Sequence, residues 1–355
     1  MAYGTSRGPV VSVLMAVHDA EGYVRRAVES IQNQSLRELE LIVVDAGSQD
    51  STARVVEAMA ERDLRIELVR ADACSRQEAL DVALERAAGR YLSVIDADGF
   101  ARSTMLADLV GRAEDRALDL AIGGVDLCLL GADGRASEVE LTADEVTFPT
   151  QHDFRSAAWR LFASGQLLPA TGKLFSLERA RDLGLRFGSD VPSDHLFVLG
   201  YLEDVERVGV IGGTCCHVDR RTAPAMRRFE RPEGGRVLER EHAALLSLYR
   251  HWGLEGDAAS MEMLQGRYME RLVACIEGVC GSRLAPAEQK AAVGRLIGTD
   301  QARLAASLAR PASNAARSML APVRSRNVGL VCAQARLLSL LGRGRTVWAM
   351  PDAFV

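Results

Sequence analysis

Paired cysteines are missing from this sequence. Its seven cysteines are an odd number, and no two of them have the spacing Cys-x-x-Cys. Structural zinc sites and the disulfide frameworks of secreted domains depend on such patterns. We therefore expect neither a disulfide framework nor a zinc site, and a reducing cytosol is the expected environment.

Long apolar runs and a strong charge of one sign are also lacking. The N-terminus "MAYGTSRGPV" has no apolar signal-peptide core, and no apolar run approaches the ~20 residues that span a bilayer. The net charge of −5 gives no general attraction to nucleic acid, which is not an expected partner. The expected location is cytoplasmic, with peripheral attachment at the inner face of the cell membrane as an option. Lysine is scarce as well, with only Lys173 and Lys290, which we attribute to coding bias.

What the sequence does contain is an alternation of strand-like and helix-like segments. Apolar, β-rich runs at 10–17, 39–45, 66–71 and 91–95 are separated by stretches with helical spacing. Short strand–helix units of this kind predict an α/β fold with a doubly wound, mostly parallel central sheet flanked by helices.

Downstream of residue 100 the pattern changes. A mixture of strands and helices follows, with a hairpin signal at "GADGR". From about residue 235 the chain is helical and rich in Ala, Leu and Arg, and Pro311 and Pro322 interrupt it. We expect four or five helices there, and two domains, residues 1–230 and 235–355.

Three aspartates lie where predicted strands end. Asp96 and Asp98 follow the fourth strand directly, and Asp45 ends the second. Sheets of this class bind ligands at the carboxyl ends of their strands, so these acids should face one crevice. Paired carboxylates suit Mg²⁺ or Mn²⁺, which often share their ligands with substrate phosphates. A solvated turn is the alternative, because Asp and Gly favour turns.

Three motifs, in order over residues 10–220, resemble those of bacterial family 2 glycosyltransferases. "VSVLMAVHDAEGYVRRAVESIQNQSLRELELIVVDAGSQDST" resembles the opening of the family, and "ALERAAGRYLSVIDADG" resembles its Asp-x-Asp segment. "GKLFSLERARDLGLRFGSDVPSDHLFV" resembles a later strand that leads to an acid at a helix start. The positions that match in the first motif are Ser30, Gln34, Asp45, Gly47, Ser48, Asp50 and Thr52.

The resemblance implies a GT-A (Rossmann-like) fold followed by a C-terminal helical region that matches nothing we can name. It implies an inverting hexosyltransferase that moves a sugar from a nucleotide-diphosphate donor, most commonly a UDP-sugar, with Mn²⁺ or Mg²⁺. The acceptor would be a hydroxyl of a glycan, a lipid-linked sugar or a small molecule, in cell-envelope polysaccharide or glycoconjugate synthesis. The alternative is a catalytically silent relative that binds nucleotide sugars or acts as a scaffold.

The resemblance also implies roles for particular residues. Asp98 would hold the metal, and Asp96 would orient the ribose or a metal-bound water. Asp194 matches the position of the catalytic base, although a carboxylate at a helix N-terminus is also stabilised by the helix dipole alone. His217 would close over the donor, with metal ligation as an option. The remaining expected donor contacts are Ala16, His18, Asp19, Asp45, Arg76, Ala97 and a diphosphate clamp of Arg220 and Arg221.

Several positions depart from the family pattern. His18-Asp19 replaces the usual Tyr-Asn, Ala46 replaces an acid that commonly binds uracil, and Gly99 replaces a third acid. Leu80-Asp81 replaces a usual Arg-Asn pair, and Arg76 is a candidate substitute for the lost basic contact. The departures allow a base other than uracil, base recognition by Asp45 or Asp19, or a weakened relative, and we favour an active enzyme with atypical donor recognition.

Two other nucleotide-dependent classes lack support. A nicotinamide-dependent oxidoreductase needs a Gly-x-Gly-x-x-Gly loop after the first strand, and "AVHDAEGY" has none. A nucleotidyltransferase should have a glycine-rich loop with Arg or Lys at the same place, which is also missing.

The end of the chain is basic. Between residues 317 and 345, arginines alternate with Leu, Val and Ala, and no acid intervenes. A basic amphipathic segment can lie on an anionic membrane. A solvated arginine face or a contact in a homo-oligomer is the more economical interpretation. The arginines are Arg317, Arg324, Arg326, Arg336, Arg343 and Arg345.

Overall fold

The computed structural model describes residues 8–130, 136–188, 193–221 and 234–341. The chain forms two compact units. One comprises Met1–Cys128, Glu140–Ala157 and Gln166–Asp219, and the other Leu129–Val139, Ala158–Gly165 and Arg220–Val355. The predicted hairpin turn at residues 131–135 lies outside the described residues. The division into domains 1–230 and 235–355 stays a prediction.

One ten-stranded sheet organises the first unit, in the order β3-β2-β1-β4-β9-β6-β10-β5, with β7 paired to β6 and β8 to β10. The strands are β1 (Val11–Val17), β2 (Leu39–Ala46), β3 (Ile66–Ala71), β4 (Tyr91–Val94), β5 (Gly99–Ala101), β6 (Leu120–Leu130), β7 (Ala136–Leu141), β8 (Val146–Phe148), β9 (Lys173–Ser176) and β10 (Val208–Arg221).

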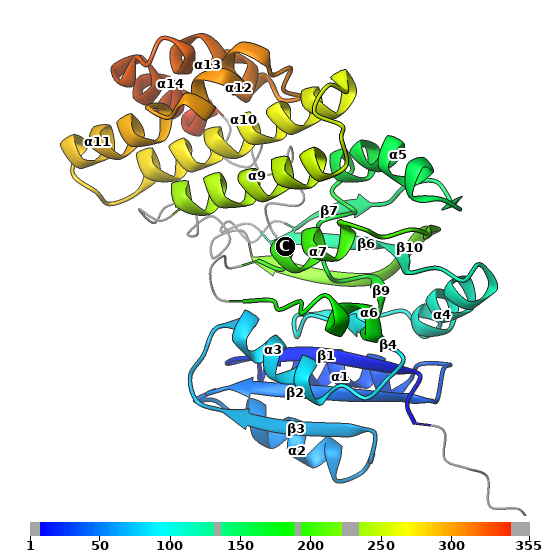
Figure 1. Cartoon of the computed structure of the whole chain (residues 1–355). Helices are drawn as coiled ribbons and strands as arrows, with labels where there is room; N and C mark the ends of the chain where they lie inside the picture. Colours follow the sequence, from blue (N-terminus) through cyan, green and yellow to red (C-terminus); the bar gives the residue numbers. More distant parts are fainter. Residues whose placement is uncertain (1–7, 131–135, 189–192, 222–233, 342–355) are drawn as a thin grey trace, which may run out of the picture. The chain divides into compact units, whose positions relative to one another are not determined.

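Seven helices are described before residue 205. They are α1 (Val24–Gln32), α2 (Thr52–Ala60), α3 (Arg76–Arg86), α4 (Met105–Asp115), α5 (Gln151–Ala163), α6 (Leu177–Asp182) and α7 (His195–Leu202). Helix α3 packs on β1 and β2, and α2 packs on β3 (Figure 1). All residues of β1 are buried except the half-buried Ala16, and all are apolar except Ser12, as expected for a strand that helices cover.

The direction of the strands differs between the two halves of the sheet. The pairs β1–β2, β2–β3 and β1–β4 are parallel, as the alternating sequence predicts. The pairs β4–β9, β6–β9, β5–β10 and β8–β10 are antiparallel. The sheet is therefore mixed rather than mostly parallel, since the later α+β segments add strands of opposite direction to the parallel half.

The parallel register brings the ends of three strands to one edge. Val17 lies beside Asp45 across β1 and β2, and Leu14 lies beside Val94 across β1 and β4. The loops that follow β1, β2 and β4 therefore leave the sheet together. The predicted site residues in these loops are His18, Asp19, Asp96, Ala97 and Asp98, and Ala16 and Asp45 lie at the ends of β1 and β2.

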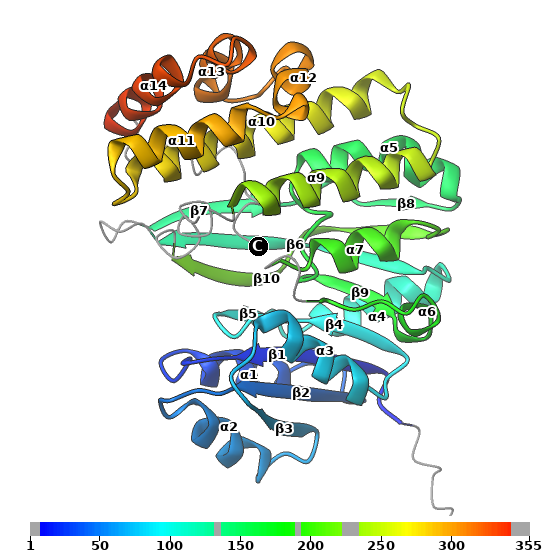
Figure 2. The same ribbon diagram turned by 60° about the vertical axis from the view of Figure 1, so that its left-hand side comes forward.

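The second unit contains six described helices rather than four or five. They are α9 (Gly234–His251), α10 (Ala258–Gly281), α11 (Pro286–Ile297), α12 (Asp300–Leu308), α13 (Asn314–Arg324) and α14 (Val328–Leu341). Helix α10 contacts each of the other five (Figure 2). Pro322 lies inside α13 instead of ending a helix. Among the described residues, no helix is long and apolar enough to cross a membrane.

Candidate active site at the carboxyl edge of the sheet

Side chains join the loops after β1 and β2. The backbone N–H groups of Ala20 and Glu21 donate to Thr52 Oγ1 at 2.7 Å and to Asp50 Oδ2 at 3.0 Å. In return, the N–H of Gln49 donates to Asp19 Oδ1 at 2.8 Å. Three of the matched motif positions, Ser48, Asp50 and Thr52, thus bond between the two loops or within them. They shape one wall of the edge.

Asp45, His18 and Asp19 lie along this wall. Asp45 is 5% exposed and accepts a hydrogen bond from the backbone N–H of Ser48 at 3.2 Å. His18 Nδ1 lies 3.0 Å from the carbonyl oxygen of Ala46. Asp19 has a positive φ of 45°, which a short polar residue tolerates in a turn. The half-buried Ala16 completes the group, so these expected donor contacts gather at one place.

Arg76 joins Asp96 to Asp194. Its guanidinium lies 2.6 Å from Asp96 Oδ1 through Nη2 and forms an ion pair with Asp194 through Nη1. Asp96 is 4% exposed and Asp194 is 1% exposed. Two carboxylates that are 98 residues apart in the chain therefore meet over one cation, which comes from the first turn of α3.

The positive charge of Arg76 is strongly stabilised. Burial alone would lower the pKa of Arg76, but the carboxylates of Asp194 and Asp96 outweigh it and raise this pKa above its ordinary value. Arg76 therefore stays protonated. The contact therefore places a fixed positive charge between the two nearly buried acids.

Asp194 precedes α7 as its N-cap, but its side chain makes no capping hydrogen bond. Asp194 thus lies at the N-terminus of α7, where the helix dipole also acts on its carboxylate. Its carboxylate is directed to Arg76.

A second layer supports Asp96. Its Oδ2 accepts a hydrogen bond from Thr171 Oγ1 at 2.9 Å. Close by in sequence, Lys173 is 1% exposed and its Nζ donates to the carbonyl oxygen of Gln166 at 2.6 Å and to that of Pro169. Burial lowers the pKa of Lys173 to about 7. One of the two lysines of the chain is therefore buried two residues after Thr171, which bonds Asp96.

Asp98 lies in a turn that is hydrogen-bonded to residues of β5 and β10. The backbone N–H of Gly99 donates to Asp96 O at 3.0 Å, and the N–H of Asp219 donates to Asp98 O at 3.2 Å. Arg26 also reaches Asp98 O, at 3.3 Å. Ala97 and Asp98 are half-buried. The turn that carries Asp98 is therefore fixed to β10.

His217 lies on β10 beside this turn, where its ring stacks on Phe100 with centroids 4.8 Å apart. Its Nε2 lies 2.9 Å from Asp219 Oδ1, and Asp219 Oδ2 lies 2.5 Å from Arg26 Nη2. Burial alone would raise the pKa of Asp219, but the hydrogen bonds from Arg26 and His217 outweigh it and lower the pKa.

The residues around the turn fit a divalent cation by their chemistry. Asp98 offers carboxylate oxygens, which Mg²⁺ and Mn²⁺ prefer, and its backbone is held on three sides. Asp96 fits this role less well, because both of its oxygens already accept hydrogen bonds from Arg76 and Thr171. Its contacts suit orientation of the ribose better than metal ligation. The side chains of Arg220 and Arg221 lie outside the described residues.

The sequence profile described as glycosyl transferase family 2 matches residues 12–150. Residues 12–150 of the chain therefore belong to glycosyl transferase family 2. EpsJ of Bacillus subtilis (strain 168), an uncharacterized glycosyltransferase, is 24% identical over 310 residues, which are 84% of this chain and 86% of EpsJ.

Solved structures give the fold of this glycosyltransferase. Residues 1–349 of S. aureus TarS, solved in complex with UDP-GlcNAc, match with a TM-score of 0.63 at 17% identity, over 92% of this chain and 90% of that one. The mannosyltransferase PcManGT from Pyrobaculum calidifontis, in complex with GDP-Man and Mn²⁺, matches with a TM-score of 0.51 at 17% identity, over 94% and 88%. The GT-A fold is therefore confirmed.

Sequence reasoning missed several residues of this glycosyltransferase that the structure brings to the edge. Thr171 and Asp219 had no motif to reveal them, and Arg26 lies in an ordinary amphipathic helix. Arg76 was expected to contact phosphate, whereas here it bonds Asp96 and Asp194. Its position at the start of a helix after a strand was the available signal.

Proposed function

We propose that this family 2 glycosyltransferase is an active, inverting, metal-dependent hexosyltransferase. It moves a sugar from a nucleotide-diphosphate donor to an acceptor hydroxyl in cell-envelope polysaccharide or glycoconjugate synthesis. The observation that carries the proposal is the contact of Arg76 with both Asp96 and Asp194. It joins the Asp-x-Asp turn and the candidate base in one site.

The reaction assigns the following tasks to the chain. Asp194 accepts the proton of the acceptor hydroxyl while that oxygen bonds to the anomeric carbon. The bond from this carbon to the diphosphate oxygen breaks, and the diphosphate leaves with the electron pair. Attack comes from the face opposite the leaving group, so the anomeric configuration inverts. Asp96, held by Thr171, orients the ribose.

A divalent cation, Mn²⁺ or Mg²⁺, would be held by Asp98. When bound, it supplies positive charge that stabilises the departing diphosphate. Asp45, Asp19 and His18 are the candidates for recognition of the base. A UDP-sugar is the first donor to try, since TarS has been solved with UDP-GlcNAc.

Localisation follows from the substrates. We place the enzyme in the cytoplasm, where nucleotide sugars are made, with the inner membrane face as the site of lipid-linked acceptors. The basic residues near the C-terminus give weak support for membrane contact. Arg326 lies 3.1 Å from Asp300 and Arg336 donates to Gln289, so both already have partners in the chain. Arg343 and Arg345 lie outside the described residues.

Substitution of the two acids tests the proposal. Asp98→Ala and Asp194→Ala should each lower the rate of transfer by at least about 10²-fold, the usual contribution of a positioned base. The exposed Asp108→Ala on α4 is the control and should keep full activity. Release of nucleoside diphosphate is measured over a panel of donors with Mn²⁺, and NMR of the product gives the anomeric configuration. Full activity of either variant removes that residue from the mechanism.

A catalytically silent nucleotide-sugar-binding protein is the second candidate. The contact of Asp194 with Arg76 favours it, because the guanidinium donates to both carboxylate oxygens, which are the atoms that would accept the proton. Ala46 and Gly99 agree with it, since both replace acids usual in the family. Nucleotide sugars with Mn²⁺ that raise the melting temperature, with no transfer to any acceptor, would support this candidate.

A further inference from the structure

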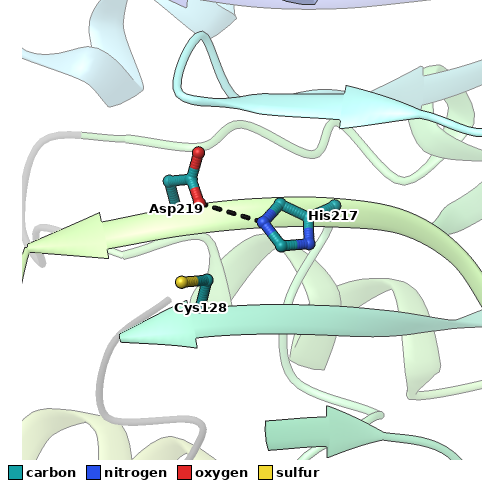
Figure 3. A group of neighbouring side chains, drawn as sticks. All are labelled: Cys128, His217 and Asp219. Carbon is teal, nitrogen blue, oxygen red and sulfur yellow. Dashed lines mark hydrogen bonds and ion pairs between the residues drawn. The ribbon is translucent and has the colours of Figure 1, made fainter. Parts of the chain in front are cut away.

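Three side chains with metal-binding atoms meet outside the group of Asp96, Arg76 and Asp194. Cys128, His217 and Asp219 each offer one ligand atom, and these atoms all lie within 4.8 Å of one another. Cys128 comes from β6, and His217 and Asp219 come from the neighbouring strand β10 (Figure 3). Among the described residues, this is the group of three or more Cys, His, Asp or Glu side chains that is close enough to share one ion.

The surroundings fix the orientation of two of these ligands. His217 stacks on Phe100, and its Nε2 lies 2.9 Å from Asp219 Oδ1. Arg26 binds the other oxygen of Asp219, Oδ2, at 2.5 Å. Arg26 is a partner of the kind that orients metal ligands in known sites. The contact between His217 and Asp219, by contrast, joins two of the ligands themselves, and binding of an ion would replace it. Cys128 is 8% exposed, so its sulfur is largely shielded from solvent. It forms no disulfide, so the sulfur is still a thiol that can bind a metal ion.

The ligand types indicate the class of ion. Mg²⁺ takes oxygen ligands and has little affinity for sulfur. A thiolate, an imidazole and a carboxylate together suit Zn²⁺ and similar transition metals. Three protein ligands leave one position of a tetrahedral zinc site open.

We propose that Cys128, His217 and Asp219 form a binding site for Zn²⁺ or a similar thiophilic transition-metal ion. This site is separate from the cation that Asp98 holds, and it assigns His217 to the new ion instead of the donor cation. Binding replaces the proton of the Cys128 thiol with a metal–sulfur bond and releases that proton to solvent. A backbone hydrogen bond joins the two sites, because the N–H of Asp219 donates to Asp98 O.

Cobalt titration tests the proposal, because Co²⁺ occupies zinc sites and a thiolate ligand gives it a near-ultraviolet charge-transfer band. Metal-free, tag-free full chain is titrated with CoCl₂ in the presence of excess Mg²⁺. We expect one equivalent of Co²⁺ to produce the band and one equivalent of ZnCl₂ to remove it. Cys128→Ser should abolish the band, and His217→Gln should weaken the affinity at least about tenfold. Absence of the band in the wild-type chain overturns the proposal.

Controls separate this site from other thiols and from misfolding. Cys280 lies beside Cys332 in the second unit and is the rival thiol source, so Cys280→Ser should keep the band. Circular dichroism checks that Cys128→Ser is folded, and Asp219→Asn, which keeps the thiol, gives an independent measurement. Retention of wild-type affinity by both Cys128→Ser and Asp219→Asn also overturns the proposal. No donor or acceptor is used, so a negative result leaves the proposed transferase activity untouched.

Discussion

Arg76 is the residue on which the candidate site depends most. Its guanidinium lies within ion-pair distance of both Asp96 and Asp194, which are nearly fully buried. Two buried carboxylates close to each other are costly without a cation between them. The guanidinium therefore holds the candidate base in place.

Replacement of Arg76 should lower both the stability and the activity of the enzyme. Arg76→Met leaves the nearly buried Asp96 and Asp194 without the cation between them, so the free energy of unfolding should fall by about 3–5 kcal/mol. The rate of transfer should fall as well, because the guanidinium holds the candidate base. Urea denaturation and the rate of nucleoside diphosphate release measure the two effects.

Two variants sharpen this experiment. Arg86→Met is the control on the same helix, α3, and removes an exposed arginine that pairs with Glu67 of β3. It should change the stability and the rate of transfer little. Arg76→Lys keeps the charge and should restore part of both losses. Wild-type stability and rate in Arg76→Met would mean that the two acids do not depend on the guanidinium.

At the scale of elements, the Ser-x-x-x-Gln motif joins a helix to the chain segment that follows the Asp-x-Asp turn. Gln34 is completely buried, and its Nε2 donates to Ser30 O at 2.9 Å and to Arg102 O at 2.8 Å. Ser30 Oγ accepts the N–H of Ala101 at 3.0 Å. The Ser-x-x-x-Gln motif therefore fixes α1 to the segment just after Asp98, which explains why a motif far from the chemistry accompanies the site.

Gly99 shows how close two strands come at the site. A Cβ at this position would lie 2.6 Å from His217 O on β10. This contact gives a physical reason for glycine at position 99. No side chain fits unless β5 moves away from β10.

Gly99→Ala should therefore displace the turn that carries Asp98. We expect a loss of about 1–3 kcal/mol in the free energy of unfolding, typical of overpacking, and a lower rate of transfer. Gly111→Ala on α4 is the matched control: nothing lies within 4 Å of its Cβ, and alanine favours a helix interior by about 0.5–1 kcal/mol. Equal stability of the two variants in urea would show that β5 can adjust freely.

The sequence predicted the parallel half of the fold because periodicity and strand ends are local signals. Asp45, Asp96 and Asp194 could be proposed as a group from strand order and motif alone. The contact of Arg76 with two acids could not, since it depends on the approach of α3 to the start of α7. Cys128 and Asp219 gave no signal either: their spacing matches no metal motif, and only the adjacency of β6 and β10 brings them together.

At the scale of the whole molecule, stability should depend on pH through Lys173. Burial lowers its pKa from 10.5 to about 7 in the folded chain. Between these values the unfolded chain binds a proton that the folded chain does not, so the free energy of unfolding rises with pH. The contribution is fully present above pH 10.5 and is lost as the pH falls to about 7.

Lys173→Met removes this dependence. The difference in free energy of unfolding between the wild type and Lys173→Met should change with pH over the range from about 7 to 10.5 and be flat below it. The variant should also be less stable at high pH, because the carbonyl groups of Gln166 and Pro169 lose their donor, at about 1–3 kcal/mol for each unsatisfied group. Denaturation series at several pH values provide the measurement. A constant difference would mean that Lys173 keeps its proton in the folded chain.

The burial of Lys173 has a practical consequence for anyone who wishes to attach this enzyme to a surface. Lys290 on α11 is exposed, and it is the only other ε-amine in the sequence. Reagents such as succinimidyl esters should therefore modify a single lysine of the native protein. Amine coupling to a biosensor chip or a dye should thus give molecules with one defined lysine linkage, far in sequence from Asp98 and Asp194.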